Sequence, residues 1–402
     1  MRRIDPTRFH VATRGTSRQI NRQIALTLIG SHQPISRADL ARRMKLRRGA
    51  VSLLVQELLT HGQVVEGTTG ESARGRKPTM LHINTSSGSS VAVDVRASRT
   101  TLMLADLMGH ARSARVALPT ARHPQRFVAM LTARIRQLLA SAPDTIGACR
   151  GIGVAVPGMV DPVNGRVIHA PTIGWRDVDL RARLSTATGL PVHIENAGRV
   201  CALAQIWQTR RNAPAARNLV FVSIADGVGV GVVVNGELLR GRHNVAGEFA
   251  HMPFSLNGPR CSCGAVGCWE AHISNRATLA RYLGRTPATG RRRALTVDDV
   301  IARARAGDGR AAAALQASAR HLGHGLAGVV NTIDPDCVVI SGEITTAWDL
   351  VEGTVRSALA ERALTPAGAR ADILIVPAED QPRLRGAAML VAAPAFAAPV
   401  VA

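Results

Sequence analysis

The chain has 402 residues, of which 46% are hydrophobic and 19% are charged; this composition excludes a disordered protein and is sufficient for two or three globular domains. The formal net charge of +22 at pH 7 excludes an acidic protein and favours polyanionic partners. An arginine bias also arises in GC-rich genomes, so the distribution of charge is the more informative signal: residues 1–90 contain 15 basic and 5 acidic residues.

No segment has the length and composition expected of a signal peptide or a membrane helix. Arg14, Arg18 and Arg22 interrupt the N-terminal region. Uncharged apolar stretches such as residues 227–236 and 386–402 fall short of the roughly 20 apolar residues that a membrane helix requires. We therefore expect a cytoplasmic protein that has no membrane partner.

The N-terminal region predicts three short helices. Apolar residues recur at helical spacing from Ile20 to Ile29, and residues 30–34 interrupt this pattern. Ser36 followed by Asp39 is typical of the N-cap of a second helix. A third apolar stripe extends from Val51 to Leu59, which is the arrangement of a helix-turn-helix unit.

Polar side chains on the third predicted helix lie away from its apolar stripe; they are Arg47, Arg48, Ser52 and Gln56. In a major groove such side chains would face base edges and phosphates. The alternative is a small helical bundle with a solvated basic face. Three helices at this spacing with a basic outer face favour DNA binding over that alternative.

A two-stranded wing is predicted after the third helix. Val64-Val65 and Met80–Ile83 bracket a polar loop that contains Arg74, Arg76 and Lys77. A cationic loop of this kind fits a narrow minor groove, although a solvated interdomain linker has the same composition. Residues 1–85 are therefore predicted to be a winged helix-turn-helix domain that binds double-stranded operator DNA.

The remaining sequence alternates short apolar strands with helical patterns, which predicts an α/β fold. We expect strands at Val91–Val95, Thr101–Asp106, Gly151–Val156, Leu190–Ile194, Leu219–Ile224, Gly229–Val234 and Cys337–Ile340, and a helix at Phe127–Leu139. The expected division is a first lobe over residues 86–207, completed by about 380–402, and a second lobe over residues 208–379.

A metal site is predicted in the second lobe from the spacing His-x9-Cys-x-Cys-x4-Cys, formed by His251, Cys261, Cys263 and Cys268. Three thiolates and one imidazole complete the tetrahedral coordination of zinc and leave no position for water, so the site is expected to be structural. Coincidental clustering of buried cysteines is the weaker alternative, because three of the six cysteines fall within eight residues.

Two sequence blocks around this site are similar to a known family. The run Ala246–His251 is Ala-Gly-Glu-Phe-Ala-His, and the block Cys261–Glu270 follows it. The pattern also includes Gly151–Gly158, Asp161, Gly174-Trp175 and Glu195-Asn196. From about residue 17 to 396 the sequence resembles the ROK family (repressors, open reading frames, kinases), and its N-terminal region resembles the repressor branch.

The resemblance implies an actin-like ATPase fold with two lobes and a sugar bound in the cleft between them. The sugar-binding positions of the family correspond to Asn196, Glu248, His251 and Glu270. Carboxylates accept hydrogen bonds from sugar hydroxyls and an amide both accepts and donates them, while zinc would hold the loop of His251 and Glu270. For Glu248 alone, a salt-bridged surface residue is the alternative.

The sequence departs from the kinases of the family at the positions that carry chemistry. Ala197 occupies the place of the aspartate that acts as general base. In the phosphate loop, Asp94–Ser98, Arg96 stands where glycines let phosphate approach the backbone, and Glu343 adds a carboxylate near the nucleotide. We expect the kinase-like domain to be inactive, and Thr172, where many relatives have asparagine, to change the sugar contacts.

Three functions are compatible with these observations. The favoured one is a DNA-binding transcriptional regulator, a repressor of carbohydrate uptake or catabolism genes that responds to a sugar or sugar derivative by a population shift. It would act on a roughly palindromic operator as a homodimer or homotetramer. The alternatives are a ROK-type sugar kinase with an appended DNA-binding domain, and a DNA-binding protein whose lobes bind no ligand.

Overall fold

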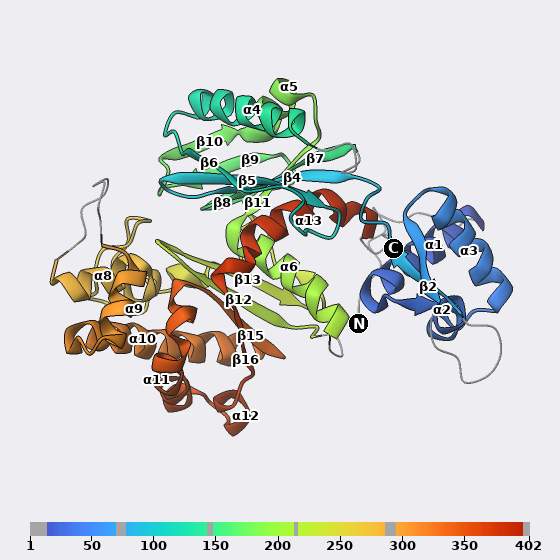
Figure 1. The fold of residues 1–402 in the computed structure, drawn as a ribbon. Coiled ribbons are helices and arrows are strands. Elements are labelled where there is room, and N and C mark those ends of the chain that lie inside the picture. Colours follow the sequence, from blue (N-terminus) through green and yellow to red (C-terminus); the bar gives the residue numbers. More distant parts are fainter. Residues whose placement is uncertain (1–13, 70–77, 143–147, 213–215, 286–294, 397–402) are drawn as a thin grey trace.

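The computed structural model describes residues 14–69, 78–142, 148–212, 216–285 and 295–396. These residues form an N-terminal domain and two α/β lobes; the lobes lie one above the other, with the N-terminal domain to one side (Figure 1). Within these ranges, no helix is both long and apolar enough to cross a membrane.

The N-terminal domain contains the three predicted helices and the two predicted wing strands. Its elements are α1 (Arg14–His32), β1 (Ile35–Ser36), α2 (Arg37–Met44), α3 (Arg48–Thr60), β2 (Val64–Thr69) and β3 (Thr79–Ile83). The Oγ of Ser36 accepts a hydrogen bond from the backbone N–H of Asp39 (3.1 Å), so the predicted cap of α2 is confirmed. Helix α1 extends past the break predicted at Gly30 and ends before Pro34, which cannot continue a helix.

The first lobe is built on a five-stranded sheet of order β11-β7-β4-β5-β6. Its elements are β4 (Ser89–Val95), β5 (Arg99–Asp106), β6 (Val116–Pro119), α4 (Pro124–Ala140), β7 (Cys149–Val156), β8 (Met159–Asp161), β9 (Arg166–Ala170), β10 (Trp175–Asp179), α5 (Leu180–Thr188) and β11 (Val192–Asn196). The strand predicted from Leu190 begins at Val192 instead, because Pro191 has no N–H to donate to the ladder. The small sheet β8–β10 was not predicted.

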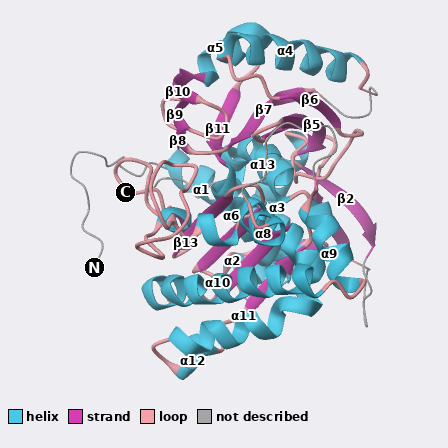
Figure 2. Ribbon diagram, turned by 90° about the vertical axis from the view of Figure 1, so that its left-hand side faces the viewer, coloured by secondary structure: helices cyan, strands magenta, loops and turns pink. Residues whose placement is uncertain are grey.

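The second lobe has a five-stranded sheet of order β14-β13-β12-β15-β16. Its elements are β12 (Leu219–Ile224), β13 (Val228–Val234), β14 (Glu237–Leu238), α7 (Glu270–Ile273), α8 (Asn275–Leu283), α9 (Val297–Arg305), α10 (Gly309–Ile333), β15 (Cys337–Gly342), α11 (Trp348–Arg362), α12 (Pro366–Ala369) and β16 (Ile373–Val376). Helices α10 and α11 cover the outer side of this lobe, as α4 and α5 cover that of the first (Figure 2).

Two helices, α6 (Ala197–Asn212) and α13 (Pro382–Phe396), lie between the two sheets (Figure 1). They belong to one apolar cluster with residues of β5, β12 and β15. The helices pack against each other so closely that a Cβ on Gly386 would lie 2.0 Å from the carbonyl oxygen of Val200. Any larger residue at position 386 would therefore force α6 and α13 apart.

The N-terminal domain is packed on the lobes through α1, which contacts α6 and α13. Met108 of the first lobe and Ala392 of α13 are buried in the same apolar cluster as Ala25, Leu26 and Ile29 of α1. This shared cluster makes the position of the N-terminal domain dependent on the packing of α6 and α13.

Candidate functional site

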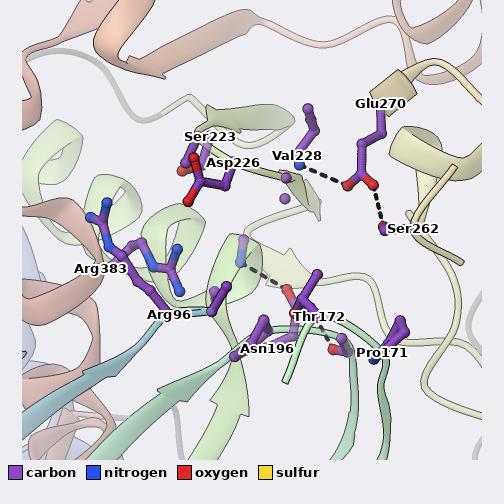
Figure 3. Close-up of a pocket in the computed structure, with 18 of the residues that line it drawn as sticks. Arg96, Pro171, Thr172, Asn196, Ser223, Asp226, Val228, Ser262, Glu270 and Arg383 are labelled. Atoms are coloured by element: carbon purple, nitrogen blue, oxygen red, sulfur yellow. Dashed lines mark hydrogen bonds between the residues drawn. The ribbon is translucent and has the colours of Figure 1, made fainter. Parts of the chain in front are cut away.

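A pocket lies between the lobes, where the carboxyl ends of strands from both sheets meet (Figure 3). Asn196 ends β11 in the first lobe, while Ala225 and Glu343 follow β12 and β15 in the second. Ligands of open α/β sheets bind at such carboxyl ends. All four predicted effector-binding residues line this pocket: Asn196, Glu248, His251 and Glu270.

Asn196 also has a structural role at the start of α6. Its Oδ1 accepts hydrogen bonds from the backbone N–H groups of Gly198 (2.8 Å) and Arg199 (3.1 Å). Its Nδ2 donates to the carbonyl oxygen of Gly158 (2.8 Å). The side chain thus satisfies two of the free N–H groups of α6 and retains one amide hydrogen for a ligand.

Glu248 and Glu270, two of the glutamates that line the pocket, differ in how firmly they are held. Glu270 accepts hydrogen bonds from the backbone N–H of Val228 (2.9 Å) and the hydroxyl of Ser262 (2.6 Å) (Figure 3). Among the residues that the structure describes, the ion-pair partner of Glu248 is Arg199, at 3.9 Å. Burial raises the pKa of the Glu248 carboxyl, and Arg199 and His251 offset only part of that shift. Glu248 is therefore the carboxylate with more free acceptor capacity.

Arg199 is a candidate functional residue that the sequence patterns did not identify. Its side chain is buried, with 1% exposed, in the first turn of α6. Its Nη2 donates to the carbonyl oxygens of Asn244 (2.8 Å) and Ala246 (3.2 Å). The guanidinium also lies 3.6 Å from buried Glu195. These contacts connect α6 to the loop that carries Glu248. In the sequence, the feature that could have identified Arg199 is a charged residue within an otherwise apolar helical run.

The predicted metal ligands form a compact cluster, in which one donor atom each from His251, Cys261, Cys263 and Cys268 lies within 4.8 Å of the others. The Sγ atoms of Cys263 and Cys268 are 3.7 Å apart, and tetrahedral zinc with bonds of about 2.3 Å would separate two sulfurs by about 3.8 Å. The donor set therefore fits a zinc ion.

Glycine shapes the loop of this cluster. Gly267 has φ +72°, and a Cβ there would lie 1.7 Å from the carbonyl oxygen of Ser255. Nδ1 of His251 lies 3.7 Å from Sγ of Cys261, and His251 also lines the pocket. One imidazole therefore borders both the cluster and the pocket, so the geometry of the pocket depends on this loop.

The opposite end of the pocket contains two arginines, Arg96 and Arg383 (Figure 3). Nε of Arg96 donates to Asp94 (2.8 Å), and Nε of Arg383 lies 2.7 Å from the other oxygen of Asp94. Arg96 is 4.0 Å from Glu343 in the second lobe. Asp94 thus lies between two cations. The sequence predicted that Arg96 leaves less room for a phosphate in the loop Asp94–Ser98, and in the structure the Arg96 side chain is paired with Asp94 at this loop.

Two further residues of the pocket bear on its chemistry. Ala197 lines it at the start of α6 and offers no titratable group. The hydroxyl of Thr172 is buried and has no hydrogen-bond partner among the described residues. A buried, unpaired hydroxyl is costly, and a ligand with hydroxyl groups would satisfy it.

Four residues at the N-cap and on the outer face of α3 are predicted to contact DNA, and all of them are exposed: Arg47, Arg48, Ser52 and Gln56. Helix α3 lies on the side of the N-terminal domain that is remote from the lobes (Figure 1). Neither arginine forms an ion pair with any residue that the structure describes. The remaining predicted DNA contacts, Arg74, Arg76 and Lys77, lie outside the described residues.

Comparison with known proteins identifies relatives along most of the chain. The sequence model of the ROK family matches residues 90–393. The xylose repressor of Bacillus subtilis is 31% identical over 89% of this chain and 91% of its own length. The crystal structure of a ROK family transcriptional regulator, a homologue of the E. coli MLC protein, has a TM-score of 0.76 and 27% identity and covers 95% of this chain and 98% of that one.

The similarity to a kinase is shorter. A ROK family glucokinase from Streptomyces griseus, in complex with glucose and AMPPNP, has a TM-score of 0.64 and 25% identity; it covers 75% of this chain and 99% of that one.

Proposed function

The chain belongs to the ROK family, and from this premise we propose that it is a DNA-binding transcriptional regulator. It represses genes of carbohydrate uptake or catabolism, and its affinity for an operator changes when a sugar or sugar derivative binds between the lobes. The observation that carries this proposal is the N-terminal domain, which exposes the basic face of α3 and packs through α1 on helices that begin at the pocket. The xylose repressor relative supports the same function.

The effector would be held by the pocket residues of both lobes. Glu248 and Glu270 would accept hydrogen bonds from sugar hydroxyls, and Asn196 and His251 would donate. Thr172 supports a polyhydroxyl ligand, because its buried hydroxyl lacks a partner among the described residues. A pocket with these groups from both lobes would bind a sugar most tightly when it is closed.

Helices α6 and α13 would carry the effector signal to the DNA-binding domain. Helix α6 starts at the pocket with Ala197, and α13 starts near it with Arg383; both contact α1. Arg199 connects α6 to the loop of Glu248. A sugar that moves this loop would therefore shift α6, and the shared cluster with α1 would transmit the shift as a change in domain orientation.

Zinc would be held by His251, Cys261, Cys263 and Cys268, with no position left for a substrate. The ion would fix the loop between the pocket residues His251 and Glu270. Its contribution would be structural, since a four-coordinate site of this composition stabilises the fold that supplies its ligands.

The protein would act as a homodimer or homotetramer. Paired α3 helices would read two half-sites of a roughly palindromic operator about one helical turn apart. Arg74, Arg76 and Lys77 would add contacts from the wing, in the minor groove or to phosphates.

Fluorescence anisotropy of a labelled DNA fragment from the region upstream of the gene, compared with a scrambled fragment at fixed salt, tests this function. We expect preferential binding to the native fragment and a change in affinity with one member of a panel of monosaccharides and their phosphates. Equal, salt-sensitive binding to both fragments would contradict the proposal, because it would reduce the interaction to the general affinity of a basic protein for DNA.

A sugar kinase with an appended DNA-binding domain is the second candidate, and the similarity to the glucokinase favours it. Ala197 opposes it, because a phosphoryl acceptor hydroxyl needs a base at that position. Consumption of ATP that depends on a sugar from the same panel would establish the kinase and displace the first candidate.

A further inference from the structure

Leu53 is an apolar side chain on the outer face of α3. It is 69% exposed, whereas the apolar residues next to it in the helix, Val51, Leu54 and Val55, are buried in the core of the N-terminal domain. Leu53 therefore contributes little to packing within its own domain. Its side chain is on the exposed face of α3, where a partner could contact it.

The residues around Leu53 on this face are short or polar. Gly49, Ala50 and Ser52 are exposed and short, so the helix axis can come close to a partner surface. Leu53 and Gln56, three positions apart and therefore on one face, are the longer side chains that extend beyond them. A partner that meets this face contacts one apolar and one amide side chain at its centre.

The arginines beside this face of α3 favour a polyanion as the partner. Arg47 and Arg48 form no ion pair with a described residue. The acidic residues of α2 and α3 are already paired, Asp39 with Arg42 and Glu57 with Arg18. A partner must therefore be anionic at its edge and must have an apolar group at its centre. The major groove of DNA meets both conditions, because phosphates flank it and each thymine presents a C5-methyl group there.

We propose that Leu53 is a specificity-determining residue that contacts the C5-methyl group of a thymine in the operator, beside an adenine contacted by Gln56. The proposal rests on the operator binding proposed above. Gln56 can form two hydrogen bonds with N6 and N7 of adenine, and the two side chains lie about one helical turn apart. Each operator half-site then contains adjacent A·T pairs at the centre of the α3 contact.

The test uses the full chain and a duplex selected by it from a random DNA library. Each thymine of the selected half-site is replaced singly by uracil, which removes only the methyl group. We expect one replacement to weaken binding about fourfold, the effect of one buried methyl group. The variant Leu53→Ala should bind the thymine and the uracil duplexes equally.

Leu364→Ala is the matched control, because Leu364 is 80% exposed and lies in the second lobe; it should retain the full dependence on thymine. If every uracil duplex binds the unaltered protein as well as the thymine duplex does, the role of Leu53 is wrong although the operator function stands. If no sequence is enriched from the library, the operator function itself fails. A loss of oligomers in Leu53→Ala, with the dependence on thymine unchanged, would assign Leu53 to an interface between copies and overturn the proposal.

Discussion

The outer face of α3 and the interlobe pocket differ in how they use charge. On α2 and α3 the acidic side chains are paired and Arg47 and Arg48 remain available, whereas the pocket contains the carboxylates of Glu248 and Glu270 on one side and arginines paired with Asp94 on the other. The first surface is complementary to a polyanion and the second to a neutral polyhydroxyl ligand. The two proposed binding functions therefore lie on separate surfaces, and each should be removable without loss of the other.

The largest effect on operator binding is expected from removing the positive charge at the outer face of α3. Replacing Arg47 and Arg48 together by alanine should weaken operator binding by about 30-fold or more and lower the salt dependence, because phosphate or base contacts are lost. Sugar binding should not change. Removal of Arg126 and Arg183, two exposed arginines of the first lobe, is the control of equal charge. If both double variants lose equal affinity, the contribution of α3 is only net charge.

The variant Glu248→Ala tests the pocket between the lobes. Loss of a charged hydrogen-bond acceptor should weaken the sugar response by about tenfold or more, while operator affinity without sugar stays unchanged. Titration of the anisotropy signal with sugar measures both quantities for one variant. Glu379→Ala, at an exposed position of the loop before α13, should leave the response intact. An unchanged response in Glu248→Ala would exclude this carboxylate from the effector site.

The metal cluster should affect the pocket and not the DNA-binding face. In Cys263→Ala, zinc measured by atomic absorption should fall from about one ion per chain to a small fraction. The sugar response should weaken, because His251 borders both the cluster and the pocket. Cys149→Ala, which changes a half-buried cysteine outside the cluster, serves as the control. Full zinc content and unchanged thermal stability in Cys263→Ala would show that the cluster is not a zinc site.

The smallest effect is expected from Ala197→Asp. Restoring a carboxylate at the start of α6 should not produce phosphoryl transfer, because Arg96 still occupies the phosphate loop and is paired with Asp94. A coupled assay of ADP formation with the effector sugar measures this outcome. Measurable turnover in this single variant would show that Arg96 leaves room for a nucleotide. The pocket would then be catalytic rather than a site that only binds the effector.

Local signals predicted the N-terminal domain well. The cap of α2 by Ser36 depends on residues three positions apart, and the apolar stripe of α3 depends on spacing within one helix. Both features could therefore be predicted from the sequence. The cysteine spacing was equally local, and it predicted a cluster whose donor atoms do lie together. The strand start at Val192 was missed because the pattern of apolar residues does not register the absent N–H of Pro191.

Residues that act across the fold were not predictable in this way. Arg199 reads as an isolated charge in an apolar helix, and its partners Asn244 and Ala246 are more than 40 positions away. The hydroxyl of Thr172 became evident as a candidate contact only in the folded structure, where it is buried without a hydrogen-bond partner among the described residues. The contact of α1 with Met108 and Ala392 joins three distant segments, and no spacing rule connects them.

Residue type and short-range periodicity were enough to predict the three N-terminal helices, the basic N-terminal region, the metal-ligand spacing and the alanine at position 197, but they did not reveal the small sheet β8–β10. The three-dimensional contacts were needed to show which side chains share the pocket, which of them already bind other groups of the protein, and how the N-terminal domain is attached to α6 and α13. The reason is physical: burial, ion pairing and close packing depend on which surfaces meet, and that is set by contacts among residues far apart in the chain.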